Sequence, residues 1–147
     1  MLFDTHAHYD DERFDEDRDT LLASMPENNV GLILNPGCDV ESSRKAVSYA
    51  NKYPFVYAAV GIHPDEVGCL NEENFAQMKE LFKEEKVVAV GEIGLDYYWE
   101  KEERARARQQ VVFARQMELA RELKLPVIVH DRDAHADCME ITRRYPD

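Results

Sequence analysis

The sequence predicts an α/β fold in which parallel β-strands alternate with helices. Five apolar runs recur along the 147 residues, and each is almost continuously apolar instead of alternating between apolar and polar positions. Continuous runs are typical of parallel strands that are buried on both faces of a sheet. We expect strands at Leu2–His8, Val30–Leu34, Val56–His63, Val87–Ile93 and Val127–His130.

The segments between these runs carry apolar residues at helical spacing. Phe75, Met78 and Phe82 form one apolar stripe, and Asn71 lies before it with two glutamates in the expected first turn. An asparagine followed by acidic residues is typical of a helix N-terminus. Other helices are expected around Leu21–Met25, Ala46–Ala50, Glu102–Lys124 and Ala134–Arg144.

The size of these strand–helix units indicates an incomplete barrel of the TIM type. Five units in 147 residues average about 29 residues each, and eight would reach roughly 240, the usual size of an eight-stranded βα barrel. We therefore expect residues 1–147 to form a single domain, the N-terminal portion of such a barrel. The competing architecture is a doubly wound open sheet, whose usual glycine-rich turn after the first strand is replaced here by His6-Ala7-His8.

Composition limits the classes of function. The formal net charge of −12 disfavours broad, salt-driven binding to nucleic-acid phosphates. A small site that meets one strand end is compatible with this charge, because bound divalent cations would add positive charge there. The three cysteines lack the paired spacing of a zinc or redox motif, and we find no membrane span or signal peptide, so we expect a cytoplasmic protein.

Two histidines follow the first apolar run at a spacing of two residues. On a strand, His6 and His8 would project to the same side and could hold one metal ion, with Asp4 orienting a ligand from behind. The pair alone leaves open a surface or helix-capping role. Two later strands also end in groups that could bind a metal, Glu92 and His130. Because barrel sites lie at the carboxyl ends of the strands, a metal site there becomes the stronger hypothesis.

Glu92 lies in an apolar run and is followed by Gly94. A carboxylate in a buried strand needs a compensating cation, which could be a metal ion or a neighbouring Arg or Lys. Glycine beside it would let the backbone approach a ligand or turn sharply.

Other residues near these strand ends could contact a substrate. His63 could bind substrate or shuttle protons with Asp65 as its partner, or the segment could be a turn that Pro64 stabilises. Arg132 could bind a phosphate or pair with a neighbouring aspartate. The aromatic run Tyr97–Trp99 suits either stacking of a base or packing of a loop.

The nucleophile is expected to be a metal-activated water. The sequence has no serine in a nucleophile-elbow pattern, no cysteine set among histidines and no phosphate-cradling glycine loop. Imidazoles with a carboxylate suit zinc or manganese, whereas a site richer in oxygen suits magnesium. The residues alone leave the metal open.

Four segments of the chain closely resemble the TatD family of metal-dependent deoxyribonucleases, which belongs to the amidohydrolase-like barrels. They are Phe3–His8, Gly61–Pro64, Gly91–Tyr97 and Pro126–Ala134, in the family's order over the whole chain. The resemblance implies a hydrolase that cleaves phosphodiester bonds of DNA, including trimming from the 3′ end. It also implies two divalent metal ions, with magnesium ahead of zinc and manganese.

The resemblance assigns roles to individual residues. His6 and His8 would hold one metal, His130 would hold the second, and Glu92 would bridge the two. Glu92 and His63 would be catalytic, and His63 and Arg132 would lie near the substrate phosphate.

The chain departs from the family in length. Family members continue for about three more βα units, which supply a further histidine and an aspartate. We therefore also consider an inactive truncated fragment or assembly module, and a barrel hydrolase acting on D-aminoacyl-tRNA esters. Five parallel strands would leave two open sheet edges, which favours self-association of the chain.

Overall fold

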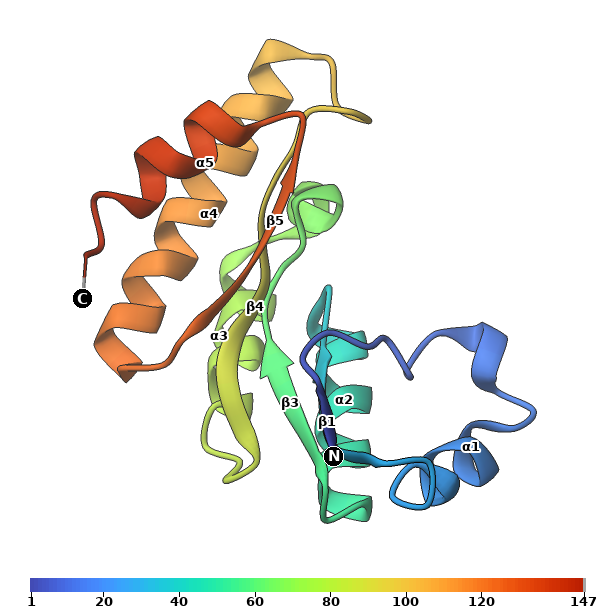
Figure 1. Ribbon diagram of the computed structural model, residues 1–147. Helices are drawn as coiled ribbons and strands as arrows, with labels where there is room; N and C mark the ends of the chain where they lie inside the picture. Colours follow the sequence, from blue (N-terminus) through green and yellow to red (C-terminus); the bar gives the residue numbers. More distant parts are fainter. Residues whose placement is uncertain (147) are drawn as a thin grey trace.

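The computed structural model describes residues 1–146, without the side chain of Cys69, and contains one parallel sheet in the order β1-β2-β3-β4-β5 (Figure 1). Each strand therefore lies beside its neighbour in the chain, as in a βα barrel, whereas a doubly wound sheet reverses its order part-way. The predicted incomplete TIM-type barrel is confirmed and the doubly wound sheet is excluded. The strands are β1 (Leu2–Asp4), β2 (Val30–Pro36), β3 (Val56–Val60), β4 (Val87–Asp96) and β5 (Val127–Arg132).

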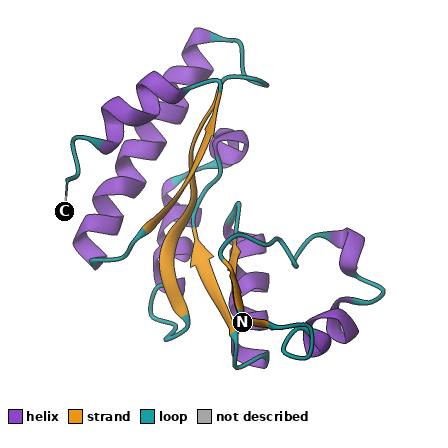
Figure 2. Ribbon diagram, in the orientation of Figure 1, coloured by secondary structure: helices purple, strands orange, loops and turns teal. Residues whose placement is uncertain are grey.

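Helices connect the strands and cover one face of the sheet (Figures 1 and 2). Helix α2 contacts β3, α4 contacts β4, and α5 packs on α4. No helix within residues 1–146 is long and apolar enough to cross a membrane. The helices are α1 (Arg18–Ser24), α2 (Val40–Lys52), α3 (Glu72–Leu81), α4 (Glu103–Leu123) and α5 (His135–Thr142), with short 3-10 helices η1 (Glu12–Phe14) and η2 (Pro64–Cys69).

Side-chain hydrogen bonds fix where two of these helices begin. Asn71 accepts a hydrogen bond from the backbone of Asn74, so the predicted N-terminus of α3 is confirmed. Asp39 caps α2 in the same way through Ser42. The predicted single domain, 1–147, ends at a residue that lies outside the described residues, and its extent stays a prediction.

The two faces of the sheet bury different side chains. Alternate residues of β3, such as Val56 and Val60, pack against the helices in the larger apolar core. Tyr57 and Ala59, which alternate with them, face the other way and form a small cluster with Leu34 and Ala89 on what would be the barrel interior. This alternation explains the continuous apolar runs, because both faces of the central strands are buried.

Several strand ends differ from the prediction. β1 ends at Asp4 rather than His8, because the chain beyond it keeps only the bond from Ala7 N to the carbonyl of Leu34 (3.2 Å) and becomes irregular. β3 ends at Val60 rather than His63, where η2 begins its turn. β4 continues past Ile93 to Asp96 because its pairing with β5 continues.

An irregularity in β4 lies at the predicted metal ligand. Val90 pairs with Val127 and Ile93 pairs with Val129, so β4 has one more residue than β5 between these pairs. Such a bulge bends a strand and redirects its side chains, which accounts for the orientation of Glu92. Gly94 then lies against β5, since a Cβ at this position would sit 2.0 Å from the carbonyl oxygen of His130. The glycine serves close approach of a neighbouring strand, not of a ligand.

Substituting Gly94 should destabilise the fold strongly. Gly94 has φ +145°, which alone costs an L-residue about 1–3 kcal/mol, and the clash with β5 adds to that cost. We expect Gly94→Ala to lower the urea midpoint of unfolding markedly. Gly68→Ala is the matched control, since a Cβ there meets nothing within 4 Å. Equal midpoints for the two variants would contradict the close approach of β4 and β5.

Candidate metal centre

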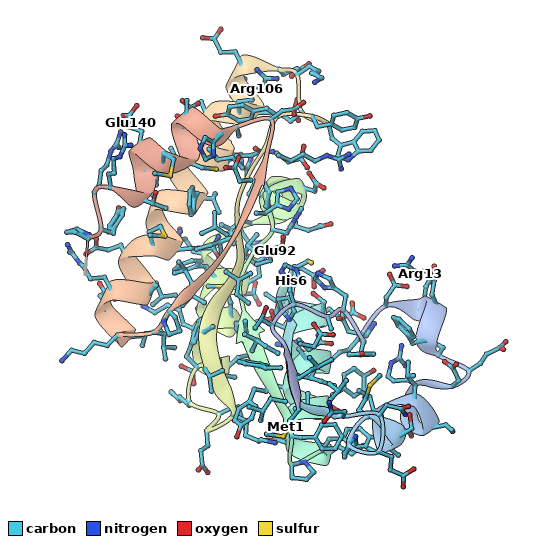
Figure 3. All side chains as sticks on the ribbon, in the orientation of Figure 1. Met1, His6, Arg13, Glu92, Arg106 and Glu140 are labelled. Carbon is cyan, nitrogen blue, oxygen red and sulfur yellow. The ribbon has the colours of Figure 1, made fainter. Side chains whose placement is uncertain are left out.

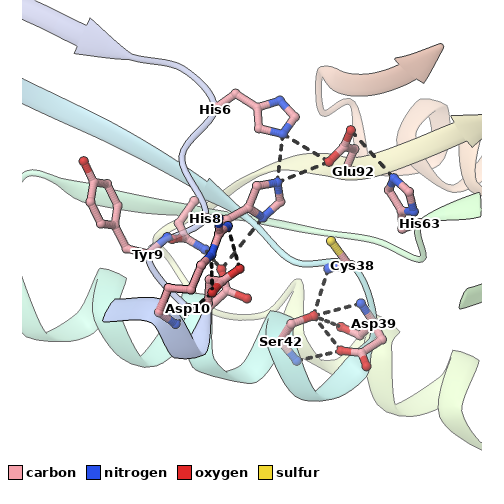
Figure 4. A network of polar contacts seen from close by, with 12 residues as sticks. His6, His8, Tyr9, Asp10, Cys38, Asp39, Ser42, His63 and Glu92 are labelled. Atoms are coloured by element: carbon pink, nitrogen blue, oxygen red, sulfur yellow. Dashed lines mark hydrogen bonds and ion pairs between the residues drawn. The ribbon is translucent and has the colours of Figure 1, made fainter. Parts of the chain in front are cut away.

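The carboxylate of Glu92 lies at the centre of a group of histidines near the carboxyl ends of the strands (Figures 3 and 4). Its side chain comes from β4 and is almost completely buried, at 6% exposure. The backbone N–H of Glu92 donates to the carbonyl of Gly37 (2.9 Å), which fixes the bulged segment against the loop after β2. A buried carboxylate of this kind requires positive charge or hydrogen-bond donors around it.

One oxygen of Glu92 faces the two histidines that follow β1. Oε2 lies 3.1 Å from Nε2 of His6 and 3.4 Å from Nε2 of His8, and these two nitrogens are 3.0 Å apart (Figure 4). The predicted convergence of the two imidazoles is thus observed, although they lie on a loop and not on a strand. Asp4 accepts from the backbone of His6 (3.3 Å) instead of orienting a ring.

The other oxygen of Glu92 faces β5. Oε1 lies 2.9 Å from Nδ1 of His130, and Nε2 of the same ring lies 2.9 Å from Oδ2 of Asp96. Asp96 is 1% exposed and stands at the end of β4. If Nε2 carries the proton and donates to Asp96, the lone pair of Nδ1 is directed toward Glu92 and is available to a cation. A carboxylate that accepts from the second ring nitrogen of a histidine is the usual support for a histidine that binds a metal.

His63 approaches the same oxygen from the loop after β3, but at a longer distance. Its Nε2 lies 4.0 Å from Oε1 of Glu92. Its Nδ1 accepts from the backbone N–H of Asp65 (3.2 Å), as the cap of η2, and the carboxylate of Asp65 lies 3.6 Å away. The turn and the partnership with Asp65 therefore coexist. Because Nδ1 accepts this bond, the neutral ring carries its proton on Nε2 and presents an N–H to the site.

Ionisation in the group follows from these contacts. Burial alone would raise the pKa of Glu92, but hydrogen bonds with His130 and His8 outweigh it and hold the pKa well below its usual range. Contacts with Cys38 and Glu92 raise the pKa of His8 to about 10, and the bond to Glu92 raises that of His130 against the effect of burial. Burial lowers the pKa of His63, and the neighbouring His130 adds to the shift. The site without a metal thus pairs the Glu92 carboxylate with a protonated His8 ring.

Two buried glutamines of α4 hold the strand ends in place. Gln116 accepts from the backbone N–H of Ile62 (2.7 Å) and donates to its carbonyl (3.0 Å), directly before His63. Gln109 accepts from the backbone N–H of Asp96 (3.0 Å). Sequence reasoning missed these glutamines and Asp96. The sequence does contain a signal for the glutamines: they lie seven residues apart on the apolar face of a predicted helix, where polar side chains are unusual.

Arg132 is exposed and stacks on aromatic rings. Its guanidinium carbon lies 4.0 Å from the ring centre of Tyr98, and the neighbouring Asp131 pairs with His135 (2.8 Å) instead. Among residues 1–146 no ion pair involves Arg132, so the guanidinium is available to an anion. The predicted pairing of Arg132 with Asp131 is not observed.

Two groups of side chains could each hold a metal ion. They are His6, His8 and Glu92, and His63, Glu92 and His130, with their ligand atoms within 4.8 Å of one another. Only Glu92 belongs to both, and its two oxygens face different groups. Mixed imidazole and carboxylate donors fit borderline divalent metals such as zinc and manganese. The residues present therefore fit a divalent metal centre.

A family model described as TatD related DNase matches residues 3–147. The chain belongs to this family. The resemblance drawn from four sequence motifs is thereby confirmed, and the match covers all the residues of the two candidate groups.

Individual relatives agree with the family match. The chain is 41% identical over 143 residues to the "Uncharacterized metal-dependent hydrolase YabD" of Bacillus subtilis, covering 97% of this chain and 55% of that protein. It is 37% identical over 135 residues to the "3'-5' ssDNA/RNA exonuclease TatD" of Cronobacter sakazakii, covering 92% of this chain and 51% of that protein. The chain thus spans about half the length of the curated relatives it matches.

Solved structures show the same fold. The TatD homologue YjjV of Escherichia coli superposes with a TM-score of 0.88 at 32% identity, covering 98% of this chain and 56% of that chain. A TatD family hydrolase of Entamoeba histolytica gives a TM-score of 0.86 at 23% identity, covering 98% of this chain and 54% of that one.

Metal binding should release protons. A metal ion requires neutral imidazoles, whereas the raised pKa of His8 keeps its ring protonated at pH 7 in the unloaded site. We expect the apparent affinity for Mn²⁺ to rise with pH, with about one proton or more released per chain at pH 7. Calorimetry at one pH in buffers of different ionisation enthalpy measures this number. His135→Gln should leave it unchanged, because that ring is exposed and lies outside both groups. Binding without proton release would contradict the protonated site.

Proposed function

We propose that this chain supplies the larger part of the catalytic centre of a divalent-metal-dependent nuclease, which cleaves phosphodiester bonds at the end of a DNA strand. One observation carries the proposal: the two oxygens of Glu92 face two separate groups of imidazoles. A carboxylate placed in this way can bridge two cations. Sites with two metal ions are common among enzymes that hydrolyse phosphodiesters.

Each ligand has a role in the proposal. His6 and His8 would hold the first ion, His130 would hold the second, and Glu92 would be shared between them. When bound, the ions polarise the phosphate and lower the pKa of a water molecule that attacks it. The set of donor atoms includes imidazole nitrogens from two parts of the chain, so manganese or zinc suits it as well as the magnesium expected from the family.

His63 acts on the substrate in this proposal and not on a metal. Its Nδ1 already accepts from the backbone of Asp65, so that its Nε2–H points toward Glu92 Oε1. An N–H at this place can donate to a phosphate oxygen or to the leaving oxygen. Arg132 then binds the phosphate from the end of β5.

The end of a nucleic-acid strand is the substrate that suits the net charge of this protein. With a net charge of −12, long phosphate tracts are repelled, whereas a single phosphate can be neutralised locally by cations and Arg132. A relative named as a 3′-5′ exonuclease of single-stranded DNA and RNA supports this substrate class.

The same water could attack the ester of a D-aminoacyl-tRNA. The products separate the two activities, because a nuclease releases mononucleotides and an esterase releases a free amino acid. The first test is therefore Mn²⁺- or Mg²⁺-dependent release of nucleotides from single-stranded DNA, with release of amino acid from a D-aminoacyl-tRNA measured in parallel. Release of amino acid from the tRNA ester, with no release of nucleotides from DNA, would replace the nuclease with the esterase.

Glu92→Gln should abolish metal-dependent release of nucleotides. The substitution removes the charge that both candidate groups share, and even outer-shell changes cost roughly 10–100-fold in metal affinity or activity. We expect a larger loss, with the fold retained by circular dichroism. Glu122→Gln is the matched control on the exposed side of α4. Unchanged turnover of Glu92→Gln at saturating metal would refute the bridging role.

His63→Asn should separate substrate chemistry from metal binding. The asparagine oxygen can still accept from the backbone N–H of Asp65, so η2 keeps its cap, but the Nε2–H is lost. We expect turnover to fall by about 10²–10⁴-fold, the usual contribution of an acid–base group, while Mn²⁺ affinity changes little. A matching loss of affinity would instead make His63 a metal ligand.

We also propose that the 147-residue chain self-associates in isolation. Within residues 1–146, β1 and β5 each pair with one strand only, and Leu2 and Phe3 on β1 are more than half exposed. Open parallel edges with apolar residues favour pairing with a second copy. Light scattering at micromolar concentration should give a mass above that of one chain, 17.1 kDa. A sharp monomer peak would refute this proposal.

A further inference from the structure

Two exposed aromatic side chains follow the strand that carries Glu92. Tyr98 is 43% exposed and Trp99 is 65% exposed, and their rings meet edge to face with centroids 4.7 Å apart. The guanidinium of Arg132 lies 4.0 Å from the ring centre of Tyr98 and 5.4 Å from that of Trp99. Large solvent-exposed aromatic rings beside a candidate active site are typical of a surface that stacks against a ligand.

The buried carboxylate that supports His130 also holds this aromatic pair. Oδ1 of Asp96 accepts from the backbone N–H groups of Tyr98 and Trp99, each at 2.9 Å, while Oδ2 faces His130. Arg106 of α4 stabilises the loop after β4 by donating to the carbonyl of Glu100 (2.8 Å). The backbone that carries the rings is therefore held in place relative to the candidate metal ligands, which lowers the entropy cost of binding against them.

A cleft opens beside Trp99. It has a volume of about 440 Å³, and its walls include Trp99, Ala105 and Pro64, the residue directly after His63. Arg104 and Arg108 also line it. Ligand sites of this size combine apolar walls with a few polar groups, and the cleft begins one residue after His63.

We propose that Trp99 and this cleft bind the base of a nucleotide next to the scissile phosphate of a single-stranded nucleic acid, with Arg132 and Tyr98 beside it. We call these residues the aromatic subsite. The proposal rests on the proposed nuclease function. A ring surface accepts the face of any base, so the subsite would tolerate sequence but require the base to be unpaired.

The charge around the cleft favours base stacking, and not contacts with phosphates, as the main source of binding affinity. Asp65, Glu100 and Glu102 line the cleft together with the two arginines, and the chain as a whole carries −12. Contacts that neutralise phosphates are therefore few, and binding should depend only weakly on salt. Base stacking then provides a larger share of the affinity than in a basic nuclease.

Trp99 is the single tryptophan of the chain, so its fluorescence reports on the subsite directly. The experiment titrates the full chain, without added metal, with a short oligothymidylate and with an abasic strand of the same length. We expect the oligothymidylate to quench the fluorescence at both 50 and 200 mM salt, and the abasic strand to leave it unchanged. No quenching, or equal quenching by the two strands, would overturn the aromatic subsite.

Variants test the same point without the fluorophore. Trp99→Ala should weaken binding of labelled oligothymidylate roughly tenfold or more, measured by anisotropy, since stacking on an aromatic ring contributes about that factor per base. Trp99→Phe should restore most of the affinity, and unfolding midpoints should stay close to that of the wild type because the side chain is exposed. Wild-type affinity of Trp99→Ala for oligothymidylate would overturn the proposal.

Hydrolysis assays keep this proposal separate from the nuclease function. Glu92→Gln should still show quenching by oligothymidylate while losing turnover. Quenching by the wild-type chain without any hydrolysis would support the aromatic subsite and contradict the nuclease activity of this chain. Hydrolysis of oligothymidylate and abasic strands at equal kcat/KM, without quenching, would support the nuclease and overturn the subsite.

Discussion

A carboxylate buried in a strand is unfavourable unless donors or cations surround it, and Glu92 meets this condition with histidines from three separate parts of the chain. The bulge in β4 directs its side chain, and Gly94 lets β5 approach closely enough to bring His130 to one oxygen. The loop after β1 brings His6 and His8 to the other oxygen. The chemistry of the site thus depends on how β4 is placed between its neighbours.

Asp96 extends this arrangement away from the metal ligands. One of its oxygens orients His130, and the other fixes the backbone at Tyr98 and Trp99. Burial would raise the pKa of Asp96, but the hydrogen bonds from Trp99 and His130 lower it, so the group stays charged. A single carboxylate therefore aligns a metal ligand with a surface that can contact substrate.

The sequence predicted the strands, their order as a partial barrel and the histidines and glutamate that meet at the strand ends. These residues could be found because a charged or imidazole group is unusual beside a continuous apolar run. Asp96 could not, since its position depends on β4 continuing through Gly94, which pairing with β5 decides. The loop placement of His6 and His8 likewise depends on a distant segment, since the backbone N–H of Ala7 donates to the carbonyl of Leu34 on β2.

The spacing of the ligands along the chain links the site to folding. His6 and Glu92 are 86 positions apart, so they meet only after the four strands β1 to β4 and the helices between them have assembled. An ion held between them would bind the folded chain and not the unfolded one, and would stabilise the fold in proportion to the logarithm of its concentration. The ion would also close a long loop of chain, and closing a long loop restricts the unfolded chain more than closing a short one. Conformational stability of the sheet would then respond to the supply of the cation in the surrounding solution.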